Sequence, residues 1–191
     1  MTAPEDSARA VAAREVGDEA ARPQAPLLVL GVGNVLLGDE GVGVHAVWEL
    51  AAAQWPSGVT VVDGGTGGFH LLSYLCDYDP VILIDATLDG QPAGTVRVSE
   101  PRYASDFPRV LSAHDIGLRD LIEAAALLRG LPRIVLITVS VAEIQPMQTE
   151  LSAPVGAALG EVAALVRDIV ARVRAAAEPP PRPSILGGDA P

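Results

Sequence analysis

The chain has 191 residues, which fits one ordinary domain, and 49% of them are hydrophobic, which is enough for a globular core. Its 24 acidic and 13 basic residues give a formal net charge of −11, and every basic residue is an arginine. This balance excludes a broad basic face, so we expect no binding to nucleic acid or to an anionic membrane, and the single cysteine, Cys76, excludes an internal disulfide.

The two ends of the chain differ in composition from its middle. Residues 1–25 mix alanine with charge and lack the apolar stretch of a signal peptide, and no run is long enough to span a bilayer, so we expect a cytoplasmic protein. Prolines punctuate residues 175–191. We predict a single domain over 26–174, between a disordered N-terminal tail (alternatively a short surface helix) and a proline-rich C-terminal tail.

Five strands are predicted along the domain. Short apolar runs at 26–32 (PLLVLGV) and 81–84 (VILI) indicate strands buried on both faces, and residues 59–62 (VTVV) predict a further strand between them in the chain. Residues 94–99 (GTVRVS) alternate apolar and polar side chains, which is typical of an edge strand. Residues 133–141 (RIVLITVSV) predict the last central strand.

Helices are predicted between the strands, at 41–54, at 68–75 and at 115–129, and a longer one follows the last strand, with Pro154 in its first turn. Strands that alternate with helices predict an α/β protein with three layers, α/β/α, and a mostly parallel sheet. In such a sheet ligands bind at the carboxyl ends of the strands.

Polar side chains gather at those carboxyl ends. Each of them alone would suit a turn or a helix cap, but a histidine together with two carboxylates makes an open site for a borderline divalent metal ion. The side chains concerned are Asn34, Asp39, Glu40, Asp63, Asp85 and His114.

The glycine-rich turn at 31–38 (GVGNVLLG) does not fit a nucleotide site. Leu36 occupies the third glycine position of the dinucleotide motif, and Asp39 and Glu40 would repel a pyrophosphate. A P-loop is excluded because the chain has no lysine. We therefore expect no nucleotide cofactor, although a nucleotide-dependent enzyme of similar architecture remains an alternative.

An ordered set of short motifs runs along the predicted domain. It begins with Gly31-Val32-Gly33-Asn34 and Gly38-Asp39-Glu40-Gly41-Val42-Gly43. It continues with Asp63-Gly64-Gly65-Thr66, residues 81–86 (VILIDA), residues 94–96 (GTV) and His114-Asp115-Ile116-Gly117-Leu118. In this order the motifs resemble those of the nickel–iron hydrogenase maturation endopeptidases, and the resemblance covers residues 27–173, nearly the whole predicted domain.

This resemblance implies an endopeptidase that removes the C-terminal peptide of a nickel–iron hydrogenase large-subunit precursor once nickel has been inserted. It also implies a five-stranded twisted sheet of order 2-1-3-4-5 with one antiparallel strand. The metal ligands it implies are Glu40, Asp85 and His114, which would bind nickel supplied by the precursor. We expect a monomer. The alternative is a non-catalytic nickel-binding chaperone.

The resemblance leaves the chemical step open. Nickel could polarise the scissile carbonyl or activate a water, or it could serve only for docking, with Asp39 or Asp63 as general base. One region departs from the family pattern: Gln145-Pro146 lacks the expected acid and Glu150-Leu151-Ser152 lacks the expected glycine. This departure leaves the identity of the partner open.

Overall fold

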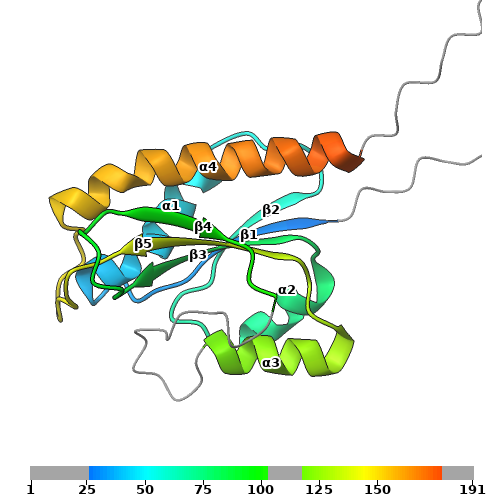
Figure 1. Ribbon diagram of the computed structural model, residues 1–191, viewed down its shortest axis with the longest axis horizontal. Coiled ribbons are helices and arrows are strands. Elements are labelled where there is room, and N and C mark those ends of the chain that lie inside the picture. Colours follow the sequence, from blue (N-terminus) through cyan, green and yellow to red (C-terminus); the bar gives the residue numbers. More distant parts are fainter. Residues whose placement is uncertain (1–25, 103–117, 178–191) are drawn as a thin grey trace, which may run out of the picture.

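A five-stranded sheet forms the middle of three layers in the computed structural model, which describes residues 26–102 and 118–177 (Figure 1). Four strands run parallel, and β4 pairs antiparallel with β5. The strands are β1 (Leu27–Gly31), β2 (Val59–Asp63), β3 (Val81–Thr87), β4 (Val96–Ser99) and β5 (Ile134–Ser140). The predicted fold class is confirmed.

The order of the strands is β2-β1-β3-β5-β4, so the implied order 2-1-3-4-5 is wrong for the last two strands. The physical reason lies in their sequences. Every residue of β5 is buried, so β5 needs a neighbour on both sides. β4 has four residues, three of them exposed, and it suits the edge of the sheet.

Helices cover both faces of the sheet. One layer holds α1 (Val42–Ala51) and α4 (Ala153–Ala177), and the other holds α2 (Leu72–Asp77) and α3 (Leu118–Arg129), as Figure 1 shows for α4 above the sheet and for α2 and α3 below it. Each layer buries its own apolar cluster. Alternate residues of a strand therefore belong to different cores: Ile82 and Ile84 pack under α1 and α4, whereas Val81 and Leu83 pack under α2 and α3.

Some predicted boundaries shift. β3 continues to Thr87 instead of ending at Ile84, because Asp85 still pairs in register with Thr138 of β5. α4 ends at Ala177, beyond the predicted end of the domain at Arg174. Within the described ranges, no helix is long and apolar enough to cross a bilayer.

Candidate active site

The site begins where β1 meets the start of α1, and close contact between backbones shapes it. A Cβ on Gly31 would lie 2.0 Å from the carbonyl oxygen of Gly43, and a Cβ on Gly43 would lie 2.3 Å from that of Val32. Only glycine leaves room for this approach. The glycines of the 31–43 stretch therefore bring the chain back onto the end of β1, and they do not form a phosphate-binding loop.

Gly33 holds the turn that carries Glu40. Its φ is +144°, and a Cβ there would lie 2.1 Å from the carbonyl oxygen of Glu40. The short 3-10 helix η1 (Gly38–Gly41) follows directly. Because the loop folds back on itself, the backbone N–H of Asn34 donates a hydrogen bond to the Glu40 carboxylate.

Glu40 and Asp85 are brought together at the carboxyl end of the sheet, next to the point where the strand order reverses between β1 and β3. Both side chains are about 3% exposed. The Ala86 N–H donates to Asp85 Oδ1 at 2.8 Å. Burial raises the pKa of Asp85 from 3.8 to about 8, the Ala86 hydrogen bond opposes this, and the negative charge of Glu40 adds to it.

When no cation is bound, ionising two buried carboxylates that lie side by side lowers the stability of the folded state. A divalent ion between them would reverse that cost, since it favours the charged form of both. Carboxylate oxygens suit a borderline divalent ion such as nickel when a nitrogen ligand completes the set. The pair therefore fits a metal site with an open position.

The predicted third ligand, His114, lies outside the described residues. Within residues 26–102 and 118–177, no three histidine, cysteine or acidic side chains come close enough to hold a metal ion. The assignment of Glu40, Asp85 and His114 as ligands thus stays a prediction, of which the structure brings two members together.

Asp39, the neighbour of Glu40, joins the site to a distant loop. Its carboxylate is 1% exposed and accepts the Ser152 N–H at 2.6 Å and the Gln145 Nε2–H at 3.0 Å. Its own N–H donates to Gln145 Oε1 at 2.9 Å. An ionised acid at position 145 could not donate to Asp39, so the glutamine that departs from the family pattern has a structural role here.

Asp63 lies away from the Glu40–Asp85 pair. The Trp48 indole donates to Asp63 Oδ2 at 2.8 Å, and the Gly65 N–H donates to Asp63 Oδ1 at 2.8 Å. Trp48 belongs to α1, on the face of the sheet opposite to α2 and α3. The carboxylate of Asp63 thus holds the turn after β2 against α1.

Sequence reasoning missed the residues that hold these acids. In the sequence, Gln145 and Ser152 stand out only as departures from a pattern, and Trp48 carries no functional signal of its own. Their contacts span 106 residues for Gln145 and 113 for Ser152. Acidic residues that follow buried strands signal that hydrogen-bond donors must lie nearby. The spacing of residues along the chain does not show which donors these are.

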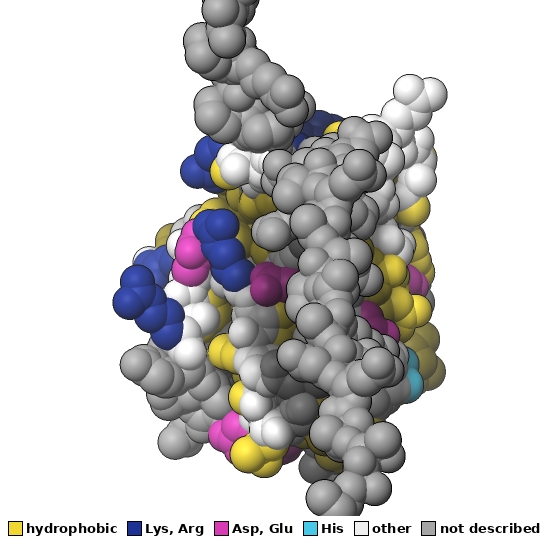
Figure 2. All heavy atoms as spheres, turned by 90° about the vertical axis from the view of Figure 1, so that its right-hand side faces the viewer, with side chains coloured by type: hydrophobic (Ala, Val, Ile, Leu, Met, Phe, Trp, Pro, Cys, Tyr) yellow, Lys and Arg dark blue, Asp and Glu magenta, His cyan; other side chains and the backbone are white. Residues whose placement is uncertain are grey.

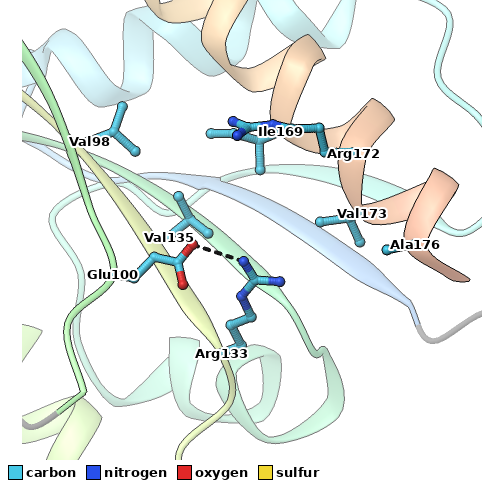
Figure 3. A pocket seen from close by; sticks show the side chains of 8 residues that line it. All are labelled: Val98, Glu100, Arg133, Val135, Ile169, Arg172, Val173 and Ala176. Carbon is cyan, nitrogen blue, oxygen red and sulfur yellow. Dashed lines mark hydrogen bonds and ion pairs between the residues drawn. The ribbon is translucent and has the colours of Figure 1, made fainter.

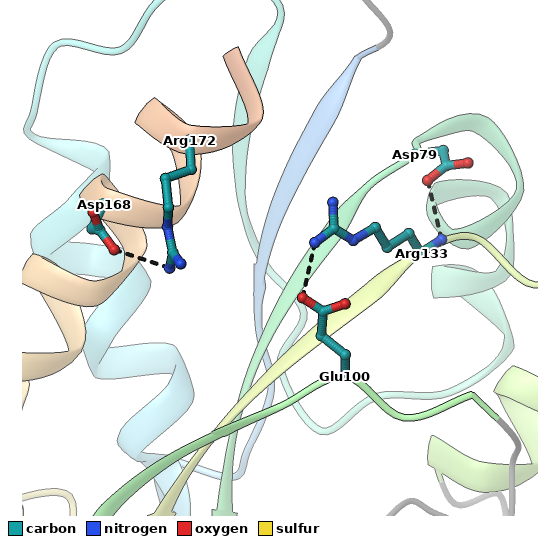
Figure 4. A network of polar contacts seen from close by, with 5 residues as sticks. All are labelled: Asp79, Glu100, Arg133, Asp168 and Arg172. Atoms are coloured by element: carbon teal, nitrogen blue, oxygen red, sulfur yellow. Dashed lines mark hydrogen bonds and ion pairs between the residues drawn. The ribbon is translucent and has the colours of Figure 1, made fainter. Parts of the chain in front are cut away.

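The amino edge of the sheet carries a different kind of polar cluster. A hollow of about 350 Å³ lies there between β4, the start of β5 and the last turns of α4 (Figure 3). Arg133 pairs with Glu100 at 2.8 Å and Arg172 with Asp168 at 2.9 Å (Figure 4). Figure 2 looks onto this side and shows arginine atoms beside acidic ones at the surface.

Comparison with known proteins identifies the family. A family model described as hydrogenase maturation protease matches residues 44–169, which include Asp85 and His114 and begin after Glu40. The hydrogenase expression/formation protein HupD of Rhizobium leguminosarum bv. viciae is 34% identical over 171 residues, which cover 83% of this chain and 85% of the relative. The chain belongs to the hydrogenase maturation protease family.

Further relatives agree with a peptide-bond hydrolase. The hydrogenase 2 maturation protease of Escherichia coli K12 is 32% identical over 149 residues, covering 74% of this chain and 91% of the relative. The solved structure of the hydrogenase maturating endopeptidase HybD from E. coli matches this protease with a TM-score of 0.68 and 31% identity, over 79% of this chain and 93% of that one. The chain is therefore an enzyme, a maturation protease.

Proposed function

We propose that this protease removes the C-terminal peptide of a nickel–iron hydrogenase large-subunit precursor after nickel has been inserted. The buried Glu40–Asp85 pair carries the proposal, because it offers two carboxylate ligands to a metal ion at the carboxyl edge of the sheet. Membership of the family supports the substrate class. The single cysteine agrees with a reducing, cytoplasmic setting, and the net charge of −11 agrees with a protein partner rather than a nucleic acid; we propose that the protease acts as a monomer.

Recognition of the metal would make cleavage depend on the presence of nickel in the precursor. The nickel arrives bound to the precursor, and Glu40, Asp85 and His114 complete its coordination. A ligand set of two carboxylates and one imidazole lacks the thiolates of tight structural sites, so the free enzyme would hold little metal of its own. A precursor without nickel would then lack the contact that aligns its scissile bond.

The hydrogen bonds of Asp39 and Asp63 support positioning roles for both. Each carboxylate accepts two N–H bonds that tie down a loop. Activation of the water or polarisation of the carbonyl would then fall to the nickel ion of the substrate. Asp39→Asn and Asp63→Asn should keep kcat within about tenfold of wild type while lowering Tm. If kcat instead falls by about a thousandfold or more while Tm is unchanged, the substituted residue acts as the general base.

The decisive experiment measures the intact mass of the cognate precursor before and after incubation with the protease, with nickel loaded and with nickel absent. We expect loss of a C-terminal peptide only from the loaded precursor. Cleavage of both forms would contradict the metal check. Binding of the loaded precursor without any cut would instead favour a nickel-binding chaperone.

A further inference from the structure

A row of polar side chains crosses the sheet beside the Glu40–Asp85 pair. Asp85 of β3 pairs in register with Thr138 of β5, and Thr138 pairs with Arg97 of β4. Two residues earlier on the same face, Leu83 pairs with Leu136, and Leu136 pairs with Ser99 of β4. Asp85 and Thr138 are both buried, so this polar row begins inside the sheet and reaches solvent at Arg97.

The three side chains of this row lie on one face. Residues that pair across neighbouring strands point to the same side of a sheet. Leu83 and Leu136, two positions before Asp85 and Thr138, both pack under α2 and α3, so the row faces that layer. Val96, the neighbour of Arg97, packs into the opposite core with Val139, which places Arg97 on the α2–α3 face as well.

Arg97 is only loosely held. Its guanidinium lies 3.7 Å from Asp89 Oδ2, and its side chain is 56% exposed. The pKa of Asp89 is lowered first by the Gln91 N–H and only to a lesser degree by Arg97. An exposed ion pair of this kind contributes little to stability, so Arg97 can exchange Asp89 for another partner.

We infer that Arg97 binds a carboxylate of the precursor segment that flanks the scissile bond, and so helps to determine specificity; this inference rests on the proposed function. Arg97 lies on the edge strand in the same cross-strand row as Asp85, so it presents a cation two strands away from the Glu40–Asp85 pair. A guanidinium matches a carboxylate with two parallel hydrogen bonds.

The spacing indicates which residue of the precursor is recognised. Arg97 and Asp85 are separated by two strand spacings, or about 10 Å between their backbones. An extended peptide advances about 3.3 Å per residue. If the scissile bond lies next to Asp85, the carboxylate that Arg97 recognises is therefore about three residues away from that bond along the precursor.

The test compares steady-state cleavage of the nickel-loaded precursor by wild type, by Arg97→Gln and by Arg97→Lys. We expect Arg97→Gln to raise KM about tenfold or more with kcat and Tm near wild type, and Arg97→Lys to recover part of the loss. Arg167→Gln is the matched control, because Arg167 is an exposed arginine on α4, and its KM should not change.

An acid-to-amide scan of the precursor within four residues of the cut identifies the partner. One such change should raise KM for wild type and have no further effect on Arg97→Gln. An unchanged KM for Arg97→Gln, or a loss confined to kcat or Tm, overturns the inference while wild-type cleavage keeps the proposed function intact. If wild type cuts no loaded precursor, the proposed function itself fails.

Discussion

The carboxyl and amino edges of the sheet both gather charged side chains, but they do so in opposite ways. At the carboxyl edge, Asp39, Glu40 and Asp85 are almost fully buried and receive backbone or amide N–H groups. At the amino edge, Glu100 and Arg133 pair at the surface with both side chains 57% exposed. Burying like charges costs stability, whereas exposed opposite charges neither cost nor contribute much. We assign the function to the carboxyl edge, where the burial of acidic side chains lowers stability.

Removing a buried carboxylate should have the largest effect. Glu40→Gln and Asp85→Asn keep the shape of the side chain but remove a charged ligand, so we expect each to lower processing of the loaded precursor by about a thousandfold or more. Mass spectrometry of the precursor measures the loss, and circular dichroism checks the fold. Either variant, if folded and fully active, refutes the role assigned to that residue.

Gly33→Ala tests the backbone packing that presents Glu40. The new Cβ would meet the Glu40 carbonyl oxygen at 2.1 Å and the residue has a φ of +144°, so we expect a loss of about 3 kcal/mol or more in the free energy of unfolding. Gly90→Ala is the control, because Gly90 also has a positive φ but nothing lies within 4 Å of its Cβ position. Equal losses in the two variants would show that close packing at Gly33 does not matter.

The pH dependence of stability tests the buried pair in the metal-free protein. Because the folded pKa of Asp85 is about 8 and its ordinary value is 3.8, the folded state retains a proton that the unfolded chain releases, and stability falls as pH rises between these values. Asp85→Asn removes this effect. We expect its Tm to exceed that of wild type by about 5 °C or more at pH 8 and by much less at pH 4. A difference that does not grow with pH would contradict the raised pKa.

The smallest effect is expected at the amino edge. Glu100→Gln breaks the pair with Arg133, and we expect the free energy of unfolding to change by less than about 1 kcal/mol, with no change in processing. Urea titration and the cleavage assay measure both quantities. A large loss of either would mean that the two edges do not differ as we argue.

The sequence could predict the layers and the chemistry of the site better than its connections. Continuous apolar runs identify β1, β3 and β5 because strands buried on both faces need them. The alternation at 94–99 predicts an edge strand, yet the order implied by resemblance misplaced it. Residues 39 and 40 are adjacent, and no pattern shows that one faces a loop and the other faces β3. That division follows from the tight turn of η1 and from contacts more than a hundred residues away.

The hydrogen bonds that Asp39 accepts from Gln145 and Ser152 have a consequence for how the substrate specificity of such proteases can change in evolution. The Asp39 carboxylate accepts hydrogen bonds from the segment after β5 at two residues, Gln145 and Ser152. It makes no such bond to the described residues between them. The backbones of Met147 and Gln148 also bond to residues 36 and 38, so side chains at 146–151 can change and reshape the rim of the site while these backbone bonds and the Asp39 contacts keep the loop in place. New partners can evolve on this stretch without rebuilding the chemistry beneath it.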